Sequence, residues 1–136
     1  MRNLTVLFAL TFSVMSSSTS FAEWTSVGAV DGHAYYVDFE KIRKNDGYVY
    51  WWILIDHSKA TKDGDWSGQT YQQGDCKSFK FKVLGVTFYK KPMGRGTGEI
   101  DNKPDKNWTY PDPKSGWWNI LKTVCRYTKY TNFGEI

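Results

Sequence analysis

The chain contains only two cysteines, Cys76 and Cys125, and both lie downstream of a segment with the features of a secretory signal. Export delivers thiols to an oxidising compartment, where such a pair is expected to form a disulfide. The bond would close a loop of roughly 50 residues, which contributes about 4 kcal/mol to the free energy of unfolding in the chain-entropy model. The sequence therefore predicts a structural crosslink and leaves no free thiol for chemistry.

The first 22 residues are interpreted as a cleaved signal peptide. Arg2 precedes an apolar run over 4–15, and Ser20 and Ala22 supply the small residues that signal peptidase requires, so cleavage is expected after Ala22. The apolar run is too short to span a bilayer. We expect a mature chain with no membrane span, and no lipid anchor because no cysteine follows the leader, located in the periplasm or secreted.

Residues 23–136 have the length of one domain and too little chain for two independent cores. The formal net charge is +4, and the basic residues are dispersed rather than clustered. Dispersed charge of this size favours solubility. Together with export, it disfavours nucleic-acid binding, and no motif predicts a cofactor.

Aromatic residues make up 18% of the chain and alternate with other residues between Gly-containing breaks. This pattern favours antiparallel strands. Asp31-Gly32 is typical of a two-residue type I′ hairpin turn, and Asp38 can cap one helical turn over 39–43. The segments expected as strands are 24–30, 33–38, 48–57, 68–76, 77–90 and 99–102, with an irregular prolyl loop over 103–113.

The segment 48–57 is almost wholly aromatic and β-branched until its end, which predicts a central strand covered on both faces. Two alternatives stay open for Trp51 and Trp52: both fill the core, or part of the strand is covered by a partner. In 77–90, the alternation predicts that Phe81 faces the core and Lys80 and Lys82 face solvent. Phe79 and Val83 are expected on the same face as Phe81, and Gly85 predicts a bulge or bend.

The apolar period changes from two to three or four residues after Gly116, which predicts an amphipathic C-terminal helix with Ser115 as its N-cap. Cys125 lies on the apolar stripe of this helix. A disulfide to Cys76 would therefore fix the helix on the sheet. The fold class is α+β.

The order of features resembles the surface-adhesin protein E domain family of Gram-negative bacteria. The motifs that carry the resemblance are Phe21-Ala22-Glu23-Trp24, Tyr35-Tyr36-Val37-Asp38, Ile42-Arg43, Tyr50-Trp51, Asp75-Cys76, Phe88-Tyr89, Gly94, Gly96 and Cys125. The resemblance covers nearly all of 23–136. It implies a single antiparallel sheet of about six strands with a C-terminal helix tied to it by the disulfide. It also implies binding of host matrix and plasma proteins by a lipid-tethered form, from which this chain departs in lacking the lipid-bearing cysteine.

Catalysis is disfavoured. His33 and His57 are the only histidines and are well separated in the sequence, and Asp56 and His57 are expected on opposite faces of one strand. Asp63 and Asp65 resemble a calcium loop only in part, since its other ligands are missing. The Gly-rich segment 94–98 opens no helix and is interpreted as a turn. The sequence predicts no enzyme and no metal site.

Aromatic residues interleaved with Lys and Arg are typical of protein interfaces. The candidate binding residues are Trp66, Tyr71, Trp108 and Tyr110. Because one helix covers only part of a sheet, we expect the uncovered part to be buried in a homodimer or by a partner. The leading hypothesis is an exported binding module for a macromolecule, a host matrix or plasma protein among the candidates. The alternative is a periplasmic structural or inhibitory protein that acts on an envelope component.

Overall fold

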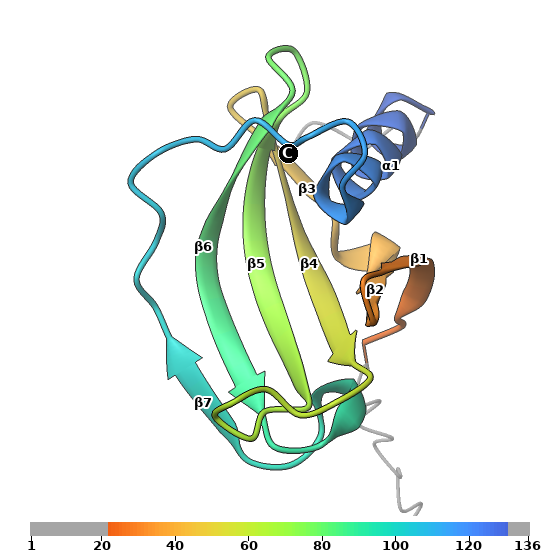
Figure 1. Cartoon of the computed structure of the whole chain (residues 1–136). Coiled ribbons are helices and arrows are strands. Elements are labelled where there is room, and N and C mark those ends of the chain that lie inside the picture. Colours follow the sequence, from red (N-terminus) through yellow and green to blue (C-terminus); the bar gives the residue numbers. More distant parts are fainter. Residues whose placement is uncertain (1–21, 131–136) are drawn as a thin grey trace, which may run out of the picture.

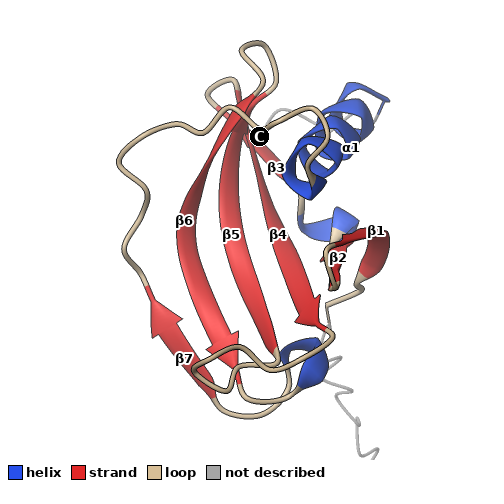
Figure 2. Ribbon diagram, in the orientation of Figure 1, coloured by secondary structure: helices blue, strands red, loops and turns tan. Residues whose placement is uncertain are grey.

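The computed structural model describes residues 22–130 (Figure 1). The predicted signal peptide lies outside the described residues except for Ala22, its last residue. Over the described range, one antiparallel sheet carries the C-terminal helix α1 (Gly116–Tyr130) on one face (Figure 2). The predicted fold class is therefore confirmed.

The sheet has seven strands in the order β1-β2-β4-β5-β6-β7, and β3 pairs with β4 off this path. The strands are β1 (Thr25–Val30), β2 (His33–Val37), β3 (Arg43–Asn45), β4 (Tyr48–His57), β5 (Ser67–Asp75), β6 (Lys80–Tyr89) and β7 (Gly98–Asp101). Two short 3-10 helices, η1 (Phe39–Lys41) and η2 (Pro92–Gly94), connect strands. β4 is central, as the sequence predicts.

Two tight turns explain the first half of the sheet. Asp31 and Gly32 have φ angles of 51° and 77°, the positive values of the predicted hairpin turn between β1 and β2. Asp46 and Gly47 repeat this geometry with φ angles of 50° and 80°. The second turn closes a hairpin of β3 on β4, so Arg43 belongs to a strand and not to the predicted helical turn.

The strand β6 begins later than predicted. Residues 76–79 form the turn after β5, in which a carboxylate oxygen of Asp75 accepts hydrogen bonds from the backbone N–H groups of Lys77 and Ser78 at 3.0 and 3.2 Å. The bond from Ser78 is the main cause of a lowered pKa at Asp75. Phe79 lies in this turn with a φ angle of 52°, yet its ring packs against the core as predicted.

The core lies between α1 and the odd-numbered positions of β4. Trp51 and Ile53 are fully buried, as are Ile120, Leu121 and Val124 of α1. The N-terminus of α1 is capped as predicted, because the Ser115 hydroxyl accepts a hydrogen bond from the Trp118 N–H at 3.2 Å. The predicted disulfide Cys76–Cys125 joins the β5–β6 turn to the helix.

The opposite face of the sheet, which we call the open face, is only partly covered. The prediction that β4 is covered on both faces is wrong at its start, where Tyr50 and Trp52 are half-buried while Trp51 is fully buried. The reason is the two-residue period of a strand: neighbouring side chains point to opposite faces, and α1 packs on one face alone. At the other end of the open face, η2 packs over Leu54.

The strand β6 follows the predicted alternation. Phe81 is buried in the core, whereas Lys80 and Lys82 pair with β5 residues on the open face. The register shifts where Tyr71 pairs with Gly85 and Gln72 with Val83, which leaves Leu84 as the extra residue of a bulge. The predicted bulge near Gly85 is thus confirmed.

Candidate binding surface

The open face carries a cluster of aromatic side chains, the aromatic row, formed by Tyr48, Tyr50, Trp52, Tyr71 and Trp108. Trp52 and Tyr71 are directly opposite in the β4–β5 pairing, and their ring centroids are 4.8 Å apart. Tyr50 stacks on the other side of Tyr71 at 6.1 Å and accepts a hydrogen bond from the Gln73 amide at 3.1 Å. Cross-strand packing therefore holds three rings in fixed positions on a half-buried surface.

Trp108 extends the row from the loop that follows β7. Its ring stacks on Tyr48 at 5.5 Å, and the ammonium groups of Lys80 and Lys82 each lie 4.8 Å from its centroid. Backbone hydrogen bonds of 2.8 and 2.9 Å between Thr109 and Phe81 anchor this part of the loop to the edge of β6. The anchored loop places an indole and two cations at one end of the open face.

The Tyr71 phenol of the row stays neutral at physiological pH. Burial raises the pKa of the Tyr71 hydroxyl, and the neighbouring Tyr50 raises it further, while the Arg43 guanidinium acts in the opposite direction. A neutral phenol both donates and accepts hydrogen bonds. The surface thus combines apolar ring faces, phenol groups and the ammonium groups of two half-buried lysines.

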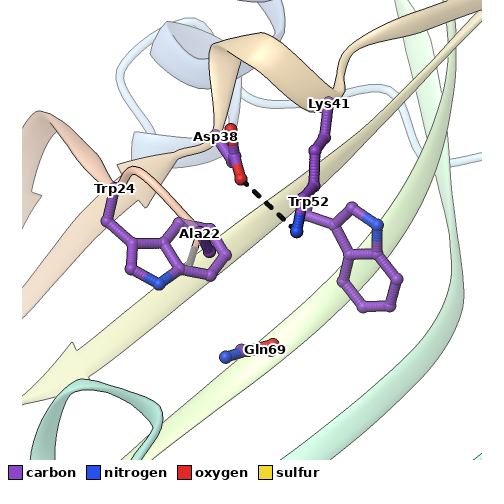
Figure 3. Close-up of a pocket in the computed structure, with 6 residues that line it drawn as sticks. All are labelled: Ala22, Trp24, Asp38, Lys41, Trp52 and Gln69. Carbon is purple, nitrogen blue, oxygen red and sulfur yellow. Dashed lines mark ion pairs between the residues drawn. The ribbon is translucent and has the colours of Figure 1, made fainter. Parts of the chain in front are cut away.

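A pocket of about 190 Å³ adjoins the row at Trp52 (Figure 3). Its lining residues are Ala22, Trp24, Asp38, Lys41, Trp52 and Gln69.

Asp38 does precede η1, but its side chain makes no capping hydrogen bond. The predicted capping role is therefore wrong, and Figure 3 shows the carboxylate directed toward the Lys41 ammonium.

The four predicted binding residues do not form one site. Tyr71 and Trp108 belong to the aromatic row. Trp66 is 37% exposed just before β5, and its odd separation from Tyr71 places the two side chains on opposite faces. Tyr110 is 67% exposed in the loop beyond Thr109.

Sequence reasoning did not name Tyr50 or Trp24 as binding residues, and it left Trp52 open between the core and a face covered by a partner. The alternation within 48–57 contains the signal for Tyr50 and Trp52, since every second residue of a half-covered strand is exposed to solvent. Trp24 gives no such signal, because it precedes β1 and reaches the pocket only through the fold.

The two histidines are not separated in space. His33 and His57 are paired across β2 and β4, and their Nδ1 atoms are 2.8 Å apart. Burial lowers the pKa of His57, and the neighbouring His33 lowers it further, while Asp56 and Asp65 act in the opposite direction. The Asp56 carboxylate accepts a hydrogen bond from the Met93 N–H at 2.7 Å and, as predicted, does not orient His57.

Other polar clusters have structural partners. The Lys90 ammonium is 2.8 Å from both the Asp65 carboxylate and the Asp63 carbonyl, so a lysine occupies the segment that resembles a calcium loop. Between residues 22 and 130, the structure brings together no three His, Cys, Asp or Glu side chains that could hold a metal ion. In the same range, no helix is long and apolar enough to cross a membrane.

Comparisons with known proteins agree with this geometry. The family profile of surface-adhesin protein E matches residues 24–126. A structure of Haemophilus influenzae protein E is 18% identical with a TM-score of 0.59, over 77% of this chain and 92% of that one. The structure of protein E from non-typeable Haemophilus influenzae is 19% identical with a TM-score of 0.60, over 77% and 78% of the two chains. At this identity the likeness shows a shared fold. No curated protein sequence matches the chain.

Proposed function

Because the chain belongs to the surface-adhesin protein E family, we propose that it is an exported, non-enzymatic binding module whose open face attaches to a protein partner. A role as a surface adhesin favours a host protein as the partner, and a matrix or plasma protein is the class that the resemblance implies. The single observation that supports a binding role is the aromatic row with its adjoining cations.

The composition of the row is that of a protein interface. Tyr, Trp and Arg are the residues that contribute most to binding energy at interfaces. Here the rings of Tyr50, Trp52 and Tyr71 are held in place by stacking, so binding costs little side-chain entropy. Lys80 and Lys82 flank the row, which favours a partner with acidic groups at that end.

Replacing the two lysines tests this role. The variant Lys80→Gln/Lys82→Gln should attach more weakly than the wild type to an immobilised panel of matrix and plasma proteins, and the difference should shrink as salt rises. Lys59→Gln/Lys62→Gln is the matched control, because it removes the same charge from the exposed loop at the opposite end of the sheet. Equal weakening by both variants would show a general charge effect and contradict the proposal.

The location of the protein tests the host-directed part of the proposal. Immunodetection on intact cells and in the medium should find the protein at the surface or released. Signal confined to the periplasmic extract would exclude a host partner and favour the alternative role on an envelope component.

A further inference from the structure

The pocket beside Trp52 contains a buried carboxylate with an unusual shortage of partners. Asp38 is 1% exposed, and its Oδ1 atom has no hydrogen-bond partner among residues 22–130. Its Oδ2 atom is 3.8 Å from the Lys41 ammonium, which is longer than a hydrogen bond. Lys41 is itself 45% exposed in its side chain. Asp38 is therefore a buried carboxyl group with only a loose contact to a cation.

Such a group is costly for the fold. Burying a carboxylate without hydrogen bonds is unfavourable, because water solvates both oxygens in the unfolded chain. The side chain could offset part of this cost by capping η1, yet it makes no capping bond. The carboxylate instead lines the pocket, where the nearest cation is the Lys41 ammonium.

The other walls of the pocket suit a flat cation. Trp24 and Trp52 contribute indole rings from the segment before β1 and from β4, and Gln69 contributes a primary amide (Figure 3). Indole faces attract cations electrostatically, most strongly when the cation loses its water. A guanidinium can stack on an indole and give two parallel hydrogen bonds to one carboxylate, which an ammonium cannot.

We propose that this pocket receives the guanidinium of an arginine side chain from the protein partner. The inference rests on the proposed function and adds a specific anchor to it. Asp38 accepts the hydrogen bonds, Trp52 and Trp24 contact the faces of the guanidinium, and Lys41 moves aside into solvent. Lys80 and Lys82 lie at the other end of the aromatic row, so displacement of Lys41 would leave the open face with an acidic end at Asp38 and a basic end. Opposite charges at the two ends would fix the direction in which a partner lies.

The probe for this pocket is N-acetyl-arginine amide, with N-acetyl-citrulline amide as its neutral analogue of the same shape. Titration of the exported protein should shift the indole N–H signals of Trp24 and Trp52 with the arginine probe and leave them unchanged with citrulline. Asp38→Asn should weaken binding of the arginine probe by about tenfold or more, because a charged hydrogen-bond partner is lost. Lys41→Met should strengthen binding, because a competing cation is removed.

Two controls keep the test falsifiable. Asp63→Asn removes an exposed carboxylate and should leave binding of the probe unchanged. Asp38→Asn should melt at or above the wild-type temperature, because it removes a poorly paired buried charge, so a loss of binding is not a loss of fold. If Asp38→Asn nevertheless fails to fold, the strengthened binding expected of Lys41→Met decides the question.

Several results would overturn the inference. Equal shifts with arginine and citrulline, or an unchanged affinity in Asp38→Asn, would show that the carboxylate recognises no cation. A further such result is that the arginine probe binds only when extra residues precede Glu23 and move the N-terminal amino group away. That result would show that the amino group of the mature chain, and not an arginine, occupies the pocket. If the arginine probe binds but does not reduce attachment of the protein to the immobilised panel, the pocket binds a free cation and not an arginine of the protein partner. The proposed function would stand if the probe fails to bind while the Lys80/Lys82 variant still loses attachment.

Discussion

Trp51 and Trp52 are neighbours in the chain with opposite environments. Trp51 is fully buried between the sheet and α1, whereas Trp52 is half-buried on the open face and lines the pocket. The sequence left both possibilities open for the pair, because a run of aromatic residues hides the alternation that distinguishes the two faces. Side-chain identity could not decide between them, but the strand period and the single covering helix do.

Close packing of Trp51 makes one glycine necessary. A Cβ added at Gly74 would lie 2.7 Å from a Trp51 ring carbon and 3.0 Å from Leu121. Gly74→Ala should therefore lower the free energy of unfolding by about 1–3 kcal/mol, because neither fully buried neighbour can move aside. Gly68→Ala on the same strand is the control, since its added Cβ meets backbone at an ordinary 3.6 Å. Urea unfolding of both variants checks this, and equal midpoints would contradict it.

The contact between His33 and His57 predicts a pH-dependent stability. The pKa of His57 is lowered from 6.5 in the folded protein, so the unfolded chain binds its proton at a higher pH. The stability from neutral His57 is complete above pH 6.5 and is lost as the pH falls through the lowered folded pKa. His57→Gln should thus lose less stability than the wild type between pH 7.5 and 5. The melting temperatures of both proteins, measured at several pH values, check this. An equal fall in melting temperature for the two proteins over this pH range would contradict the assignment to His57.

At the scale of elements, the helix α1 is held by both packing and a crosslink. Its stripe of Ile120, Leu121 and Val124 is buried against the sheet, and Cys125 bonds to the β5–β6 turn. The sequence predicted the start of this helix and its buried stripe, because a helical apolar period and an N-cap serine are local signals. The strand β3 escaped prediction, because three exposed polar residues carry no such signal and pair only through the turn at Asp46 and Gly47.

Removing the crosslink should destabilise the protein without changing its fold. The two cysteines are 49 positions apart in the sequence, and the variant Cys76→Ser/Cys125→Ser removes the bond that closes this loop. The loss should lower the free energy of unfolding by about 4 kcal/mol. The stripe of α1 should still dock, so the far-UV circular dichroism spectrum should stay the same below the transition. Unfolding in urea without reductant measures the difference, and an unchanged midpoint would rule out a stabilising role.

For the whole molecule, the decisive feature is that one sheet has two different faces. The sequence predicted the single layer and an uncovered part, but the candidate residues that it selected lie on both faces of the sheet. Trp66 and Tyr71 were grouped by residue type, whereas the pairing of strands places them apart. Homodimerisation through the open face stays a prediction, which sedimentation of the wild type and of Tyr71→Arg can test, because an arginine buried in such an interface would dissociate it.

The most direct measurement compares two double variants in attachment to the protein panel. Trp52→Ala/Tyr71→Ala removes the centre of the aromatic row, and Trp66→Ala/Tyr110→Ala removes two exposed aromatic residues outside it. Loss of central interface aromatics typically costs 2 kcal/mol or more, so the first variant should bind about thirtyfold more weakly while the second keeps wild-type affinity. Full binding by the first variant with loss in the second would contradict the assignment of the open face as the binding surface.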